Sequence, residues 1–301
     1  MRRVALAFVA VLSLARPGSA DVTYLALGDS LAFGETDFAH NPSKGDRGYV
    51  SILADHLAGF NGGMRPTVVN LGLDGETTSS YTTGVGNALG AQAAAWNLNY
   101  PNAATTQSSL VATTIAQAHA AGRDVKYVTV SLGANDLYSA LADPSFFALK
   151  PGQQGDMIHA KLSAVVANDA TILHDLRAQL PNAQIALLGY YNPYPALTGT
   201  PIAQASSPVI QALNGVIAAE ASIFKASYVD AYTPFLGHEA DATYIRTLAF
   251  GQPNVHPNAA GYGLIGWQLS AVPEPSSVAL LGLGLVAVAA RLRSRSRRRA
   301  A

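Results

Sequence analysis

The body of the chain alternates short apolar runs with longer amphipathic segments. Five runs of three to eight residues are rich in aliphatic and β-branched side chains, which is typical of buried strands. They are Val22–Leu27, Thr67–Asn70, Val125–Leu132, Gln184–Leu188 and Ser227–Val229. Helix-like segments separate or follow them at residues 49–57, 109–121, 157–180, 209–224 and 262–269. This alternation predicts an α/β fold, a three-layer α/β/α sandwich with a central parallel five-stranded sheet covered on both faces.

One segment, from Gly84 to Gln107, does not follow the alternation. It is rich in Gly, Ala and Asn and has no clear period. We interpret it as an insertion or a lid over a crevice. Its glycines, Gly84 and Gly86, do not follow a strand, so they do not form a dinucleotide-binding motif.

Polar motifs stand at the ends of three predicted strands and before the last helix. They are Gly28-Asp29-Ser30, Asn70–Thr77, Gly133–Asp136 and Val255–Asn258. The carboxyl ends of parallel strands open onto the same crevice, so we expect these motifs to converge.

Ser30 follows the first strand through a tight turn into a helix-like segment. A hydroxyl at that place can act as a nucleophile, because the N–H groups at the start of the helix can stabilise an oxyanion. The alternative is that Ser30 only caps the helix. The convergence of the other motifs favours the catalytic interpretation.

The four motifs resemble the four blocks of the SGNH, or GDSL, hydrolase family, and they occur in the family's order. The matching stretches are GDSLAFG at 28–34, NLGLDGET at 70–77, GAND at 133–136 and VHPNAAG at 255–261. The resemblance covers nearly all of the chain between Val22 and Leu269. It implies the flavodoxin-like fold of SGNH hydrolases and the activity of a serine esterase or lipase.

By this resemblance, Ser30 is the nucleophile and His256 is its general base. The backbone N–H groups of Ser30 and Gly75 and the side-chain amide of Asn135 form the oxyanion hole. Glycine lets the backbone approach a substrate closely, and an amide donates a hydrogen bond without a competing charge. The simpler alternatives are a helix-entry glycine at 75 and a turn residue at 135. The other six histidines lack a comparable context, and we expect surface or core roles for His40, His56, His119, His159, His174 and His238.

The chain departs from the family at one position. The family usually has an aspartate three residues before the histidine, where this chain has Pro253. A backbone carbonyl could orient His256 instead, giving the Ser–His dyad that we favour. Otherwise another acid, such as Asp230, Glu239 or Asp241, reaches the histidine, or activity is weak or lost.

These observations predict a secreted or envelope-associated serine ester hydrolase that acts on carboxylic esters of lipid, sugar or aryl alcohols. The alternative is a catalytically weakened SGNH-fold binding protein of the envelope or matrix, and acyl transfer is a variant of the first. Tyr190, Tyr191 and Tyr194 follow the fourth strand. They form either an aromatic wall for the substrate or ordinary packing.

Composition narrows the choice of partners. The formal net charge of the whole chain is zero, but nine of its basic residues are arginines at the two ends. Without these nine arginines and Glu274, 10 basic and 18 acidic residues remain, which is a net charge of −8. An acidic body argues against nucleic-acid binding. The chain has no cysteine, no His-Glu-x-x-His pair and no P-loop. We therefore expect no metal and no cofactor.

Both ends of the chain look like targeting segments. Residues 1–20 combine arginines, an apolar stretch and small residues, as a secretory signal peptide does. Residues 273–301 begin Pro-Glu-Pro and continue with the uncharged run Val278–Ala290 and six arginines. They resemble the PEP-CTERM sorting signal, which implies recognition and cleavage by an exosortase; a plain transmembrane anchor is the alternative. Residues 21–272 are then the hydrolase domain.

Overall fold

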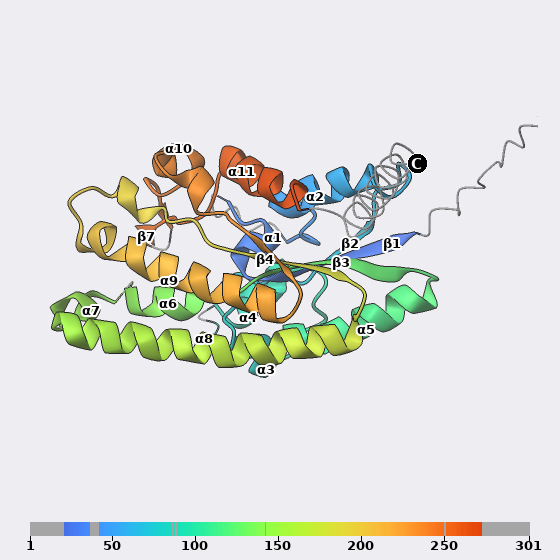
Figure 1. Cartoon of the computed structure of the whole chain (residues 1–301), viewed down its shortest axis with the longest axis horizontal. Helices are drawn as coiled ribbons and strands as arrows, with labels where there is room; N and C mark the ends of the chain where they lie inside the picture. Colours follow the sequence, from blue (N-terminus) through green and yellow to red (C-terminus); the bar gives the residue numbers. More distant parts are fainter. Residues whose placement is uncertain are drawn as a thin grey trace, which may run out of the picture.

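The computed structural model describes residues 21–36, 42–85, 87, 89–141, 143–249 and 251–272. A five-stranded sheet lies between two layers of helices (Figure 1). All neighbouring strands are parallel, in the order β2-β1-β3-β4-β5. The strands are β1 Val22–Gly28, β2 Thr67–Asn70, β3 Asp124–Ser131, β4 Gln184–Leu188 and β5 Ser227–Val229. The predicted signal peptide and the predicted sorting segment lie outside the described residues.

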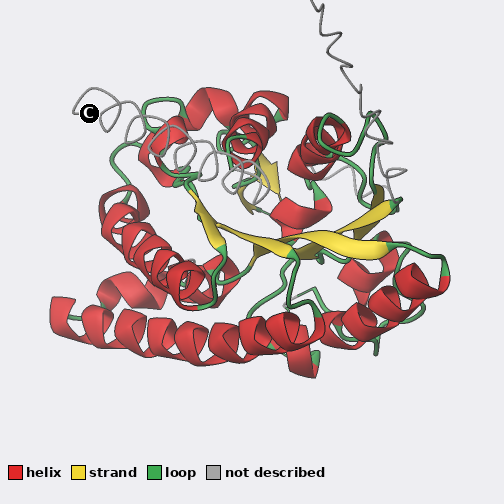
Figure 2. Cartoon of the chain, turned by 45° about the vertical axis from the view of Figure 1, so that its right-hand side comes forward, coloured by secondary structure: helices red, strands yellow, loops and turns green. Residues whose placement is uncertain are grey.

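Helices cover both faces of this sheet (Figure 2). Helices α2 and α11 pack together on one side, and α5, α8 and α9 lie on the other. The helices are α1 Ser30–Phe33, α2 Gly48–Ala58, α3 Ser80–Thr83, α4 Ala91–Trp96, α5 Gln107–Ala120, α6 Ala134–Leu141, α7 Pro144–Ala148, α8 Pro151–Gln179, α9 Pro201–Ile223, α10 Glu239–Ala242 and α11 Ala259–Ser270. Two 3₁₀ turns, Tyr194–Ala196 and Thr233–Phe235, and a short antiparallel pair, β6 Leu248–Ala249 and β7 Gln252–Pro253, complete the described elements.

The predicted fold class is confirmed, and the five predicted strands are observed with ends that shift by one residue at most. Helix α9 begins at Pro201, eight residues before the predicted start, because it continues through Pro208. Helix α6, directly after Gly133, was not among the predicted elements. In the described part of the chain, no helix combines the length and apolar character needed to span a membrane.

Strand β1 lies near the centre of the sheet and is buried at all seven positions. A parallel strand that is covered on both faces needs apolar side chains on both, which explains its continuous apolar sequence. Its last residue, Gly28, has a φ of +131°, and a Cβ there would lie 2.2 Å from the carbonyl oxygen of Ser131. Only glycine therefore lets β1 turn away so close to β3.

The segment between Gly84 and Gln107 packs along the loop that follows β2. The Asn97 side chain donates hydrogen bonds to the carbonyls of Asn70 (3.0 Å) and Gly72 (2.8 Å). The Tyr100 hydroxyl donates to the carbonyl of Leu71 at 2.7 Å. These three hydrogen bonds fix the backbone of the loop that follows β2.

Candidate active site

Ser30 is the first residue of α1 and is 8% exposed. The residue that caps this helix is Asp29, whose Oδ1 accepts a hydrogen bond from the N–H of Leu31 at 3.0 Å. The alternative that Ser30 serves as the cap is therefore wrong. Its hydroxyl is not needed for the start of the helix, and it lines a cavity.

Asp29 fixes this turn to two other strands. Its Oδ1 accepts a hydrogen bond from the Ser131 hydroxyl at 3.1 Å, and its Oδ2 accepts one from the Tyr190 hydroxyl at 2.5 Å. Burial raises the pKa of Asp29 to about 6, although these hydrogen bonds favour the ionised form. The turn that carries Ser30 is thus tied to the carboxyl ends of β3 and β4.

Gln107, at the start of α5, holds the turn from the other side. Its side chain is fully buried and pairs with both backbone groups of Gly28, accepting from the N–H at 2.6 Å and donating to the carbonyl at 2.9 Å. Its Nε2 also lies 3.2 Å from Oε2 of Glu76. Burial raises the pKa of Glu76 to about 7. Sequence reasoning missed Gln107, because nothing local marks a contact across 79 residues.

Asn135 lies in the first turn of α6, and its Nδ2 donates to the carbonyl of Glu76 at 2.9 Å. The next residue, Asp136, accepts hydrogen bonds from the Thr78 N–H at 3.0 Å and the Thr78 hydroxyl at 2.7 Å. Helix α6 is thereby joined to the loop after β2. Each Asn side-chain amide carries two hydrogens, so one remains to donate elsewhere.

Gly75 lies in that same loop with a φ of +75°. A Cβ at this position would lie 2.8 Å from Oδ1 of Asn87. Asn87 in turn donates to the carbonyl of Asp74 at 2.9 Å. The backbone at Gly75 is therefore held in a conformation that favours glycine.

His256 lies on the loop between β7 and α11 and is 5% exposed. Its Nδ1 is 2.9 Å from Oδ1 of Asn254, and the same oxygen accepts a hydrogen bond from the His256 backbone N–H at 3.0 Å. The Asn254 Nδ2 donates to the carbonyl of Thr36 at 2.9 Å. Asn254 is itself 1% exposed, so this arrangement is fixed within the protein.

The two backbone partners define which way the Asn254 amide points. A backbone N–H can only donate and a carbonyl can only accept, so the oxygen must face His256 and the nitrogen must face Thr36. Nδ1 of His256 then carries the hydrogen, because it faces an acceptor. In the neutral imidazole, Nε2 is left with a lone pair and can accept a proton.

We favoured a backbone carbonyl as the group that orients His256; the structure instead places the side-chain oxygen of Asn254, which was not considered, against Nδ1. Two of the three acids considered make other hydrogen bonds: Asp230 accepts from the N–H groups of Tyr232 and Thr233, and Glu239 accepts from the N–H of Gly237. The partner stands two residues before the histidine instead of three. An Asx side chain at that offset was the available signal in the sequence.

Tyr191 supports the loop that carries the histidine. Its hydroxyl donates to the carbonyl of Val255 at 2.5 Å, and its ring stacks on Phe235 with 4.2 Å between ring centroids. The neighbouring Tyr190 contacts Asp29, as described above. Two adjacent tyrosines after β4 therefore position the Ser30 turn and the His256 loop.

A cavity of about 70 Å³ brings these parts together. Ser30, Asn135 and His256 all line it; Gly75 is not among its lining residues, although the loop of Gly75 is joined to Asn135. The remaining lining is mainly apolar or aromatic and consists of Asp29, Leu31, Ala134, Leu137, Tyr138, Leu141, Tyr190, Tyr191, Pro193, Tyr194, Ile210 and Val255. The three tyrosines, for which we left open an aromatic wall or ordinary packing, line this cavity and are also buried in the core.

None of the described residues between Gly84 and Gln107 lines this cavity. In the described part of the chain, no three His, Asp or Glu side chains gather in a way that could hold a metal ion.

Two models of known protein families match the chain. The model of the GDSL-like Lipase/Acylhydrolase family matches residues 26–264, and that of the PEP-CTERM protein-sorting motif matches residues 271–295. A search of the curated proteins finds no match.

Several solved structures share the fold. A lipase from a goat rumen metagenome is 20% identical, with a TM-score of 0.56 and coverage of 83% of this chain and 96% of that one. A mutant of an acetyl-xylooligosaccharide esterase from Geobacillus stearothermophilus is 17% identical, with a TM-score of 0.52 and coverage of 85% and 97%. At such low sequence identity, these structures show a shared fold and nothing more.

Proposed function

The chain belongs to the GDSL-like lipase/acylhydrolase family, and we propose that it is an ester hydrolase with Ser30 as nucleophile and His256 as general base. One observation carries the proposal. Ser30, Asn135 and His256 line the same cavity, while Asn254 holds the proton of His256 on Nδ1. A histidine that carries its hydrogen on Nδ1 can accept a proton at Nε2, and together with a serine at a helix start in the same cavity it is suited to acyl transfer.

In the first half of the reaction, the Ser30 hydroxyl oxygen attacks the ester carbonyl carbon while Nε2 of His256 takes its proton. The tetrahedral oxyanion receives hydrogen bonds from the N–H groups of Ser30 and Gly75 and from the second Nδ2 hydrogen of Asn135. The C–O bond to the alcohol then breaks, and His256 gives its proton to the leaving oxygen. An acyl-Ser30 ester remains.

In the second half, a water molecule gives a proton to His256 as its oxygen attacks the acyl carbon. The bond to Ser30 breaks, the proton returns to the serine oxygen, and the acid leaves. Asn254 stabilises the protonated imidazole through a neutral carbonyl oxygen rather than a carboxylate. We therefore expect a slower enzyme than one with a full Ser-His-Asp triad.

The cavity favours short acyl groups. Its volume is only about 70 Å³, and most of its lining is aliphatic or aromatic. An acyl chain of a few carbons fits such a space, and the alcohol remains on the open side.

The test is hydrolysis of p-nitrophenyl acetate and butyrate by the chain from Asp21 to Ala301, with Ser30→Ala and His256→Ala variants. We expect turnover in the parent and a loss of at least about 100-fold in each variant. Parallel assays with Asn61→Ala, which removes a buried amide outside the cavity, control for general damage. Unchanged turnover in Ser30→Ala would overturn the proposal, and a folded but inactive parent would favour a binding protein.

The sorting motif at residues 271–295 indicates export and sorting to the envelope. We propose that residues 1–20 are a signal peptide removed before Asp21 and that an exosortase recognises the C-terminal segment. The hydrolase domain, residues 21–272, would then act outside the cytoplasm. Mass spectrometry of the N- and C-termini of the protein recovered from an exosortase-containing host tests both cleavages.

A further inference from the structure

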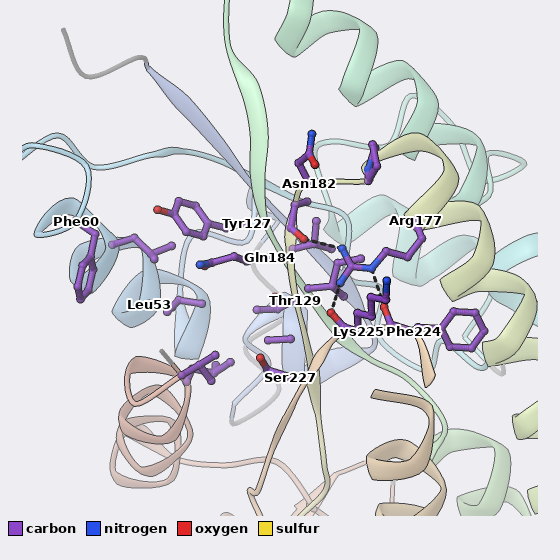
Figure 3. A pocket seen from close by; sticks show the side chains of 18 of the residues that line it. Leu53, Phe60, Tyr127, Thr129, Arg177, Asn182, Gln184, Phe224, Lys225 and Ser227 are labelled. Carbon is purple, nitrogen blue, oxygen red and sulfur yellow. Dashed lines mark hydrogen bonds between the residues drawn. The ribbon is translucent and has the colours of Figure 1, made fainter. Parts of the chain in front are cut away.

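A second and much larger cavity lies at the opposite end of the sheet from Ser30. It has a volume of about 570 Å³ and its floor includes the first residues of β4 and β5, Gln184 and Ser227 (Figure 3). Tyr127 pairs with Gln184, Thr129 pairs with Ala186, and Ala186 pairs with Ser227. Because side chains alternate along a strand, these five share one face of the sheet. We call this cavity the β3–β5 groove.

Helices α2 and α11 line this groove but leave the first residues of β4 and β5 partly exposed. On the other face, Val130 and Leu187 meet Ile172 of α8 and Ile217 of α9 and leave only about 10 Å³ of space. Parallel sheets bury both faces under helices, so this incomplete cover of β4 and of the edge strand β5 is unusual. In the groove, Gln184, Ala186 and Ser227 keep partial exposure.

The walls of the groove are largely apolar and firmly held. Leu53, Leu57 and Phe60 line it from α2 and the turn that follows, and Ile223 lines it from the end of α9. Phe60 is 51% exposed and Ile223 is 71% exposed, so both present large apolar surfaces to the solvent. Contiguous exposed apolar surface is a feature of binding sites.

Arg177 fixes the rim on the side of α8 and α9. Its guanidinium donates to the carbonyls of Ala183 (2.7 Å), Phe224 (2.8 Å) and Lys225 (2.6 Å) (Figure 3). These bonds join the end of α8 to the turns before β4 and β5. The groove is therefore built into the fold rather than being a gap between loose loops.

The chain itself supplies the occupant. Val272, the last described residue, lines the groove, so the chain continues from its edge. Residues 273–277, Pro-Glu-Pro-Ser-Ser, follow, and then the 13 uncharged residues of Val278–Ala290. Five residues span about 17 Å at most when fully extended. The start of the apolar run is therefore within reach of the groove.

We propose that the β3–β5 groove binds the apolar run Val278–Ala290 of its own chain before the sorting segment is removed. The run covers the partly exposed residues at the start of β4 and β5, and the groove shields the run from water and from other chains. Removal of the segment, or its entry into a membrane, leaves the groove empty. This inference does not depend on the hydrolase activity.

The absence of cysteine from the chain makes a clean cross-linking test available. In the chain from Asp21 to Ala301, Gln184→Cys on the groove floor is combined in turn with Leu280→Cys, Leu281→Cys, Leu283→Cys and Leu285→Cys. The control series replaces the floor cysteine by Ala164→Cys, on an exposed position of α8. Mild oxidation in lipid-free, detergent-free buffer is followed by gel electrophoresis and peptide mass spectrometry.

We expect a disulfide within one chain for at least one Gln184→Cys pair, in several-fold higher yield than for the matching control pair. Ser227→Cys replaces Gln184→Cys if the latter does not fold. Equal yields in both series would overturn the proposal, as would the absence of any disulfide within one chain. Disulfides that form only between chains would assign the groove to a second copy instead.

Discussion

Oδ1 of Asn254 lies 2.9 Å from Nδ1 of His256, where the family usually supplies an aspartate one residue earlier in the chain. The amide keeps the hydrogen-bond geometry of a carboxylate and omits its charge. Orientation of the imidazole and stabilisation of its protonated form, which an aspartate provides together, are therefore separated in this protein.

Asn254→Asp is expected to raise kcat/KM by about tenfold, because a carboxylate stabilises the imidazolium by roughly 1.4 kcal/mol or more. The same change puts a carboxylate oxygen against the carbonyl of Thr36 in place of the Nδ2 donor. We therefore expect the free energy of unfolding to fall by about 1–3 kcal/mol. Ester hydrolysis and urea unfolding measure the two effects; a slower variant of unchanged stability would contradict this account.

Asn254→Ala removes the acceptor altogether and is expected to lower kcat/KM by about 100-fold, since His256 loses its fixed tautomer. Stability also falls, so Asn61→Ala serves as the matched control. Asn61 is likewise buried, and its Nδ2 donates to the carbonyl of Met64, away from the cavity. A similar loss of activity in both variants would show that the effect of Asn254→Ala is only structural.

Tyr190→Phe tests the hydrogen bond that this tyrosine donates to Asp29. That bond lowers the pKa of Asp29, so its removal raises the pKa further above 6. At pH 8 the variant is expected to lose about 2 kcal/mol of stability, because a hydrogen bond to an ionised group is lost. At pH 5 the loss is smaller, since Asp29 is then mostly protonated in the parent as well.

Tyr100→Phe is the control for this comparison, because its hydroxyl donates to the neutral carbonyl of Leu71. Its cost is expected to be about 1 kcal/mol and equal at both pH values. A pH-independent cost in Tyr190→Phe would contradict the assignment.

Stability as a whole is expected to fall as the pH rises from about 4 to 8. Burial raises the pKa of Asp29 to about 6 and those of Asp74 and Glu76 to about 7. Between their ordinary and raised pKa values, the folded state binds more protons than the unfolded state, so the free energy of unfolding decreases with pH. Urea unfolding at pH 5 and pH 8 measures this decrease.

Asp74 is the sharpest single test of this pH dependence. Its Oδ2 is buried without a hydrogen-bond partner, and the charges of Glu35 and Asp29 raise its pKa further. Asp74→Asn is therefore expected to make the protein more stable at pH 8 and to flatten the pH profile. Asp156→Asn removes the same charge from an exposed position and serves as the control. An unchanged pH profile in Asp74→Asn would contradict the assignment.

The sequence was sufficient for the sheet, because each strand is an apolar run bounded by turn residues. The sequence was less informative about helices whose ends depend on tertiary packing rather than on local residue preferences. Pro208 suggests a helix boundary, yet α9 continues through it, with a start fixed by the Thr200 side chain, which accepts from the N–H of Ala203 at 3.3 Å. The short helix α6 has few residues to establish a period.

For the site, the convergence of strand ends placed Ser30, Asn135 and His256 at one cavity, while their chemical roles remain predictions. The partner of His256 was missed, although an Asx residue two positions before the histidine was a signal for it. The family's aspartate stands three residues before the histidine, and in this chain that position is Pro253. Pro253 belongs to β7, and the chain after this strand brings Asn254 to the imidazole. Gln107 was missed for a different reason, since its contact with Gly28 depends on the tertiary fold alone.

The last prediction concerns the length of the acyl group. Tyr194 lines the cavity and its ring lies parallel to that of Tyr138, 6.5 Å away between centroids. Tyr194→Ala removes the ring and enlarges a space of about 70 Å³, so a longer chain gains room. We expect the ratio of kcat/KM for p-nitrophenyl octanoate to that for the acetate to rise by about tenfold, since each buried methylene contributes about 0.8 kcal/mol. Phe60→Ala, which removes an aromatic ring from the distant β3–β5 groove, should leave this ratio unchanged. A ratio that is equally unchanged in Tyr194→Ala would mean that the acyl chain lies outside this cavity.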